Sequence, residues 1–354
     1  MAVRSRPMRA ADIHECVEIV AAHPVIGPRY QDALEDLHVA WHRLLDCEAK
    51  SQFVFEEVEQ DRTRILAAGV SVFVTDDFVR WLKAPPFSWI GPELARRIAR
   101  GQSPLLSDKE LREANSGGGL NLLCWDNSVG ADKVIDLYYN IMPIFMAEHR
   151  GYLWKEIIAM QADTADRLRA MVKSGGRLMN PANGEWEESF SGEPEEIVKR
   201  PHLIGLSREI EMRKPGSLVG MLFNYQAPHF GFSVSEQRLL LAALRGGTDE
   251  ELADELGISL SAVKKAWRGI YDRVAAEMPD IIPARSAAGS RAPERTREKK
   301  RHLMAYLQEH PEELRPHSRK LVKQNGGAKA APDTRKAGAA GGTGAYRPDC
   351  DEHG

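Results

Sequence analysis

Runs of β-branched and aromatic residues predict β-strands in the first third of the chain. Residues 52–62 and 62–79 form two such runs, separated by a short charged turn. This is the pattern of an antiparallel strand pair. Residues 117–127, with the sequence GGGLNLLCWDN, predict a third strand after a glycine-rich turn.

Helical periodicity follows these strands. From 134 to 178, apolar residues recur at spacings of three and four, interrupted at Pro143 and at Arg150-Gly151, so we expect helices there. Residues 200–212 predict one more strand. Strands and helices mixed in this way, after an antiparallel start, predict an α+β fold for residues 1–230.

The pattern changes at Gly231, after which the chain is compact and helical as far as residue 283. Ser233 and Glu236 have the spacing of a capping box, in which the hydroxyl and the carboxylate each bond the other residue's backbone N–H. Gly246 and Gly247 predict the end of this first helix, because glycine readily adopts a positive φ.

A second and a third helix follow, joined by a tight turn. Thr248 and Glu251 repeat the capping box, and the small side chain of Ala253 predicts a close crossing of two helices. Gly257 supplies the turn, and Ser259 is expected to cap the third helix.

The third helix has two different faces. Val263, Ile270 and Val274 are expected to point into the core. The other face and the helix start carry three cations and two serines, which are the predicted DNA contacts: Lys264, Lys265, Arg268, Ser259 and Ser261. Long cations on the first half of an exposed helix reach phosphates and base edges together. Simple solvation is the alternative role for such charges.

Length and charge bound the organisation of the chain. A chain of 354 residues exceeds the usual size of one hydrophobic core, so two domains are expected. With a formal net charge of -3, any nucleic-acid-binding surface must be local. Residues 284–301 carry seven Arg or Lys against two Glu and are expected to form a basic linker. A short helix should follow, and the Gly/Ala-rich residues 323–354 should be disordered.

Membrane and disulfide classes are not expected. The longest apolar run, residues 65–74, is shorter than the roughly 20 residues that span a bilayer. The N-terminus has charges but no apolar signal segment, so a cytoplasmic protein is expected. The four cysteines form no CxxC pair, which argues against a zinc knuckle and a disulfide scaffold.

Three further groups have both a chemical and a structural interpretation. His38 and His42 stand at i and i+4 and could share a metal ion with Asp46, although packing is the expected role. Residues 116–119 can cradle an anion or simply turn the chain before a strand. Glu148-His149 carries proton-transfer groups that act only if the fold places them in a cleft.

Residues 232–274 resemble the LuxR-type helix-turn-helix domain of bacterial transcription regulators. Glu236 matches that family's scaffold-helix glutamate, residues 251–253 match its first-helix core, and residues 263–264 match the start of its recognition helix. Ala266 and Gly269 depart from the family, which has a frequent histidine and a basic or polar residue there, so base-reading positions stay open. The resemblance implies a homodimer on paired half-sites of double-stranded DNA.

The N-terminal region resembles GCN5-related N-acetyltransferase-like domains. Residues 3–24 predict the family's opening strand and helix, and strands at 53–60, 65–74 and 120–126 before a helix at 152–158 fit its order. Active members hold the pyrophosphate of acetyl-CoA at a helix N-terminus, which the resemblance assigns to Arg150 and Gly151. Leu153 replaces the next glycine of the motif, so the resemblance implies a sensor or a decayed enzyme, with weak acetyl-CoA binding at most.

The sequence therefore predicts an acetyltransferase-like sensor domain at 1–230, a LuxR-type domain at 231–283, a basic linker and short helix at 284–322, and a disordered tail at 323–354. The predicted function is sequence-specific DNA binding in transcription regulation, as a dimer and with a small-molecule effector. One alternative is an N-acyltransferase that uses acyl-CoA and has an appended helical module. Another is a helical protein-interaction module whose basic face meets an acidic partner.

Overall fold

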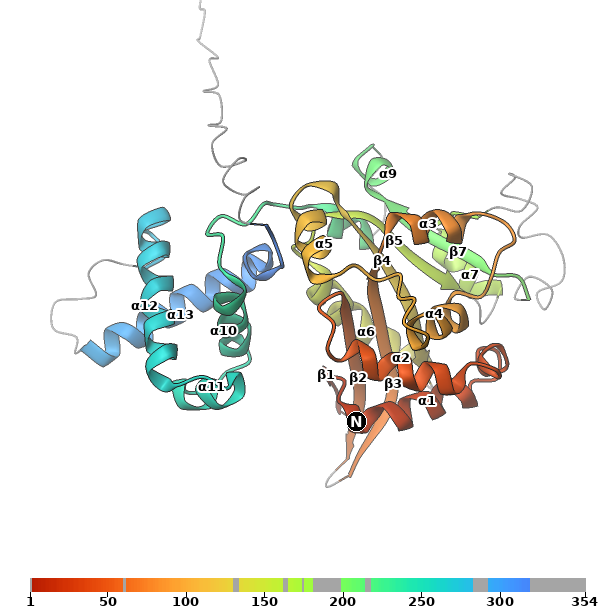
Figure 1. Ribbon diagram of the computed structural model, residues 1–354, viewed down its shortest axis with the longest axis horizontal. Helices are drawn as coiled ribbons and strands as arrows, with labels where there is room; N and C mark the ends of the chain where they lie inside the picture. Colours follow the sequence, from red (N-terminus) through yellow and green to blue (C-terminus); the bar gives the residue numbers. More distant parts are fainter. Residues whose placement is uncertain are drawn as a thin grey trace, which may run out of the picture.

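The computed structural model describes most of the chain (Figure 1): residues 2–59, 62–129, 134–161, 165–173, 175–180, 199–213, 218–282 and 292–318. The tail expected to be disordered, at 323–354, and most of the expected linker before residue 292 lie outside the described residues.

A mixed sheet organises the first part of the chain, which confirms the α+β prediction. Its strand order is β1-β2-β3-β4-β5-β7-β6. The strands are β1 (Ala2–Pro7), β2 (Lys50–Glu59), β3 (Arg62–Val74), β4 (Leu120–Val129), β5 (Trp154–Gln161), β6 (Arg177–Leu178) and β7 (His202–Ser207). Neighbouring strands are antiparallel except β4 and β5, which run parallel. Strands are present within each of the predicted ranges 52–62, 62–79, 117–127 and 200–212, although residues 76–79 and 208–212 are helical.

Helices cover both faces of this sheet. One face packs under α1 (Ile13–Ala22), α2 (Leu34–Leu44), α3 (Asp76–Lys83) and α4 (Ile90–Ala99). The other face packs against α6 (Val134–His149) and the 3-10 helix η7 (Val219–Phe223). Shorter or peripheral helices are α5 (Asp108–Glu113), α7 (Ala165–Lys173) and α9 (Arg208–Arg213). We call residues 2–223 the sheet half.

The helix expected at 152–158 is wrong, because this segment is strand β5. Ile157 and Ile158 are adjacent in the chain, yet they belong to the cores on opposite faces of the sheet. β5 pairs with β4 on one side and with β7 on the other. A short apolar run fits a helix or a buried strand equally well. Here the hydrogen bonds to the two neighbouring strands make the segment a strand.

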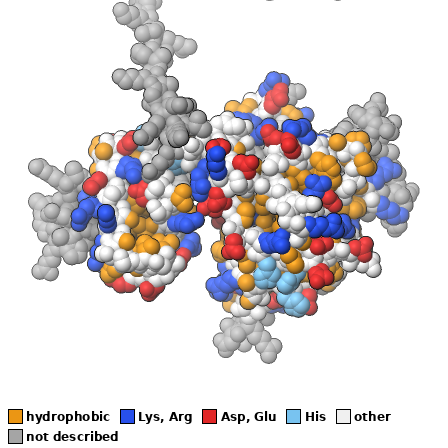
Figure 2. Space-filling view, in the orientation of Figure 1, with side chains coloured by type: hydrophobic (Ala, Val, Ile, Leu, Met, Phe, Trp, Pro, Cys, Tyr) orange, Lys and Arg blue, Asp and Glu red, His pale blue; other side chains and the backbone are white. Residues whose placement is uncertain are grey.

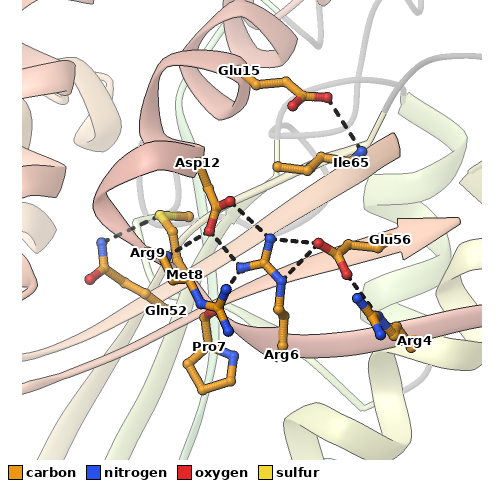
Figure 3. Close-up of polar contacts among 10 residues, drawn as sticks. All are labelled: Arg4, Arg6, Pro7, Met8, Arg9, Asp12, Glu15, Gln52, Glu56 and Ile65. Carbon is orange, nitrogen blue, oxygen red and sulfur yellow. Dashed lines mark hydrogen bonds and ion pairs between the residues drawn. The ribbon is translucent and has the colours of Figure 1, made fainter. Parts of the chain in front are cut away.

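An ion-pair network fixes the start of the chain (Figure 3). Arg6 on β1 donates from Nη1 and Nη2 to Asp12 at 2.6 and 2.8 Å, and from Nε to Glu56 on β2 at 2.7 Å. Arg4 bonds the second oxygen of Glu56 at 2.8 Å. The hydrogen bond from Arg6 is the main cause that holds the pKa of Asp12 below its usual value. The network ties β1, β2 and the start of α1 together.

Four helices form a separate helical half, residues 230–309 (Figure 1). They are α10 (Val234–Leu244), α11 (Asp249–Leu256), α12 (Leu260–Glu277) and α13 (Ala292–Glu309). Their apolar side chains form a cluster of their own, which includes Leu239, Trp267, Ile270, Leu303 and Leu307.

The predicted helix ends of this half are confirmed. Ser233 with Glu236 and Thr248 with Glu251 form complete capping boxes. Gly257 ends α11 in the left-handed conformation, with φ of 64°. The Ser259 hydroxyl accepts the Ala262 N–H at the start of α12.

The basic linker was expected to continue to residue 301, and this boundary is wrong. Helix α13 begins at Ala292, so residues 292–301 are helical. Leu303 and Leu307, one helical turn apart, are buried in the cluster of the helical half. Their burial anchors α13, and the charged residues before them continue the same helix. No helix in the part of the chain that the structure describes is long and apolar enough to span a membrane.

Candidate functional site

Helix α12 exposes the three predicted cations. Lys264, Lys265 and Arg268 lie on its first half and are exposed to solvent. None of them forms an ion pair or a hydrogen bond with the residues that the structure describes. Three unpaired cations within one and a half helical turns make a local positive surface on a chain whose net charge is negative.

Buried apolar side chains of α12 orient the three cations toward solvent. Val263, Trp267, Ile270 and Val274 are all buried under α12. Their spacing of three and four puts them on one stripe of the helix. The cations occupy the positions between these anchors, so burial of the stripe turns them to solvent.

The two serines lie at the start of the same helix. Ser259 caps α12, and its hydroxyl lies 3.0 Å from that of Ser261. Both residues are exposed. The structure therefore brings all five predicted DNA contacts to one end and one side of α12.

Helix α11 beside them is acidic, but its carboxylates are largely engaged. Of its five, Glu251 accepts the Thr248 N–H at 2.7 Å, and Glu255 pairs with Arg245. Asp249 lies 3.6 Å from the ammonium of Lys300 on α13. This ammonium also lies 5.1 Å from the ring centroid of Trp267. No local pattern in the sequence singles out Lys300, because these two partners are 33 and 51 residues away in the chain.

A bidentate ion pair fixes α12 on α10. Arg273 donates to both oxygens of Glu236, at 2.8 and 3.0 Å. Burial acts to raise the pKa of Glu236, but hydrogen bonds from Arg273 and Ser233 hold it below its usual value. Glu236 thus caps α10 and holds α12 with one carboxylate.

Arg150 and Gly151 do not open a helix, contrary to the expected pyrophosphate motif. They follow the C-terminal end of α6 and precede β5. The exposed donors of a helix N-terminus, which favour an anion, are therefore absent at these two residues. Arg150 instead donates to the carbonyl of Glu309 at 3.1 Å.

His149 lies in the core, and Glu148 beside it is half-buried. His149 is 2% exposed, and its Nδ1 lies 2.8 Å from the Phe145 carbonyl. Burial lowers the pKa of His149 to about 4, and burial also raises the pKa of Glu148. Phe145 and Met146 pack against a neighbouring apolar core.

Residues 117–119 line an open pocket of about 570 Å³ in the sheet half. The other walls come from the start of β5, residues 153–156, and from α9 with Ser207. Its charged side chains have partners in the fold: Lys155 bonds Asp76 at 2.9 Å, and Glu156 bonds Lys83 at 2.6 Å. Gly117 and Gly118 belong to the π-helical turn η3 (Ala114–Gly118).

The predicted histidine pair is part of a surface cluster. The rings of His38 and His42 lie 4.7 Å apart, and His14 of α1 lies 6.5 Å from His38. Figure 2 shows histidine side chains, in pale blue, gathered over the region of α1 and α2. No three His, Cys, Asp or Glu side chains of the described ranges are placed to hold a metal ion, so Asp46 does not complete a site with the pair.

Comparison of the chain with models of known protein families gives no match, and no curated protein matches it. Among solved structures, it is similar to the loading GNATL domain of CurA from Lyngbya majuscula, with 11% sequence identity and a TM-score of 0.37. The similarity covers 58% of this chain and 98% of that chain.

Proposed function

We propose that this chain is a cytoplasmic, sequence-specific DNA-binding transcription regulator in which α11 and α12 act as a LuxR-type helix-turn-helix. The observation that carries the proposal is the set of unpaired, exposed cations on the first half of α12: Lys264, Lys265 and Arg268. A recognition helix presents its N-terminal residues to base edges in the major groove.

The surroundings of α12 support this role. The acidic side chains of α11 are partly neutralised by Arg245 and Lys300, which reduces their repulsion of phosphates. Arg297 and Arg301 are exposed on α13 and add sequence-independent attraction to the DNA backbone. Ser259 and Ser261 are placed to donate to phosphates beside the cations.

Selection from a random library of duplex DNA tests the proposal. The purified chain should enrich one sequence, and its affinity for that sequence should exceed its affinity for scrambled DNA at the same salt concentration. Lys264→Ala with Lys265→Ala should abolish the enrichment. A matched control is Lys109→Ala with Lys173→Ala, because both lysines are exposed on the sheet half and the change in net charge is equal. Equal affinity for all sequences would exclude specific recognition.

The proposal includes a homodimer on paired half-sites and a small-molecule effector for the sheet half. The resemblance of residues 232–274 to LuxR-type domains supports the dimer. Sedimentation of the protein with DNA of one and of two half-sites distinguishes one bound copy from two.

A second candidate is acyl-CoA binding by the sheet half, either as a sensor or as an N-acyltransferase. The pairing of the parallel strands β4 and β5 ends at Cys124 and Ala159, although both strands continue. This early end of the parallel ladder is the observation that favours this candidate. Thermal unfolding with acetyl-CoA tests it: a stabilisation that grows with ligand concentration supports binding, and product formation with an amine acceptor separates an enzyme from a sensor.

A further inference from the structure

Residues 310–318, which we call the strap, lie between the two halves. On the sheet half, Arg315 of the strap donates to the carbonyls of Arg150 and Ala147, at 2.8 and 3.1 Å. These carbonyls lie at the C-terminal end of α6, a position at which the helix dipole favours a cation. The guanidinium also lies 4.7 Å from the ring centroid of Tyr152.

The turn η3 holds the other end of the strap. Asn115, which is 1% exposed, donates from Nδ2 to the Pro316 carbonyl at 2.7 Å and accepts the Leu153 N–H at 2.8 Å. The hydroxyl of Ser116 accepts the Ser318 N–H at 2.7 Å. The same turn lines the sheet-half pocket through Gly117 and Gly118.

The helical half holds the strap from the opposite side. Glu313, 1% exposed, accepts the backbone N–H groups of His229 and Phe230 at 2.6 and 3.0 Å. Gln237 on α10 donates from Nε2 to the carbonyl of Arg315 at 2.8 Å. Leu314 is buried in the apolar cluster of the helical half.

Gly151 allows the close approach of the strap. A Cβ on Gly151 would lie 2.5 Å from the Glu312 nitrogen and 2.8 Å from the Pro311 carbonyl carbon. Any larger residue at this position therefore requires the strap to move. Outside the strap, Arg150 donates to the Glu309 carbonyl at 3.1 Å, and Arg238 pairs with Glu48 at 3.1 Å. Ion pairs at the surface contribute little.

We propose that the strap is a latch that fixes the helical half, and with it α12, on the sheet half. Its buried polar contacts reach both halves, so movement of η3 beside the pocket is transmitted to α10 through residues 313–316. The latch deepens the proposed function as its regulatory connection, but its existence does not depend on DNA binding.

The substitution Gly151→Ala tests the latch in the full chain. Gly101→Ala is the matched control, because Gly101 has a similar φ of 77° but no atom within 4 Å of its added Cβ. Spin labels at exposed positions report the separation of the halves: Lys109→Cys on α5 and Ala276→Cys on α12, with Cys47, Cys124 and Cys350 replaced by serine.

The wild type and Gly101→Ala should show one narrow distribution of label distances, and Gly151→Ala should show a broad or longer one. Arg315→Ala, which removes the bonds to α6 without entering either core, should broaden it as well. Circular dichroism checks that both halves stay folded in each variant. Unchanged distances in Gly151→Ala and Arg315→Ala, or equal broadening in Gly101→Ala, would overturn the latch, whatever the outcome of the DNA selection.

Discussion

Arg273 of α12 donates two hydrogen bonds to the carboxylate of Glu236 on α10, at 2.8 and 3.0 Å. The Glu236 side chain is 14% exposed and also caps α10. One carboxylate thereby fixes both the start of the first helix and the position of the helix that carries the exposed cations.

Loss of the Arg273–Glu236 ion pair should lower the stability of the helical half. Arg273→Ala leaves the partly buried carboxylate of Glu236 with the cap alone, and we expect unfolding in urea to become easier by about 2 kcal/mol. Arg245→Ala is the control, because its pair with Glu255 is exposed on both sides and should contribute at most about 1 kcal/mol. Equal losses in the two variants would contradict the role given to Arg273.

The network at the N-terminus predicts a larger effect. Arg6→Ala removes the partner of Asp12 and of Glu56, whose side chains are 10% and 3% exposed. Loss of one partner of a buried ion pair costs roughly 3–5 kcal/mol. Arg4→Ala should cost clearly less, because Arg4 is 61% exposed and Glu56 keeps Arg6. Chemical unfolding of both variants, followed by circular dichroism, measures the difference.

Two glycines in the helical half should respond to alanine in opposite directions. Gly257 has φ of 64°, so Gly257→Ala should destabilise the protein by about 1 kcal/mol through backbone strain. Gly269 lies inside α12 with open space around an added Cβ. Gly269→Ala should therefore stabilise it by about 0.5–1 kcal/mol. Thermal unfolding checks both signs, and destabilisation by Gly269→Ala would show that this helix is strained.

The strap should hold more weakly as the pH rises. Burial raises the pKa of Glu313 from 4.5 to about 7, against the hydrogen bonds from His229 and Phe230. A raised carboxyl pKa means that the closed strap prefers the protonated acid. The contribution of Glu313 to the stability of the closed strap is therefore complete below pH 4.5 and is lost as the pH rises through 7.

Label distances at pH 5 and pH 8 test this dependence. The distribution should be broader at pH 8 in the wild type, and Glu313→Gln should remove the change. Other titratable groups near Glu313 are Glu312, His310, Tyr306 and Tyr225. His317 contacts Gln237, whose amide also donates to the Glu313 carbonyl. His310→Asn is the control and should keep the dependence. A pH response that survives in Glu313→Gln would assign it to one of these neighbours.

The proposed DNA surface predicts a change in salt dependence. If Lys264 and Lys265 each neutralise one phosphate, then their double replacement by alanine should reduce the slope of log affinity against log salt by about 2. Titration of labelled duplex at several salt concentrations measures the slope. The same slope in the variant and the wild type would place the phosphate contacts elsewhere.

Part of this molecule was predictable from the sequence, because the interactions are local. The caps at Ser233, Thr248 and Ser259 and the left-handed Gly257 each involve residues within about one helical turn. The outward face of Lys264 and its neighbours follows from the period of the helix. The antiparallel pair of β2 and β3 was predictable for the same reason, since only two residues separate the strands in the sequence.

Contacts between distant residues decided the rest. The sequence pattern of β5 also fits a helix, and only pairing with β4 and β7 makes it a strand. Arg150 and Gly151 contact the strap, which lies about 160 residues later in the chain. The bond from Asn115 to Pro316 spans 201 residues, and no local pattern in the sequence specifies such a partner. Helix formation and capping are decided within a few residues, whereas sheet pairing and the joining of the two halves depend on surfaces that exist only after the chain has folded.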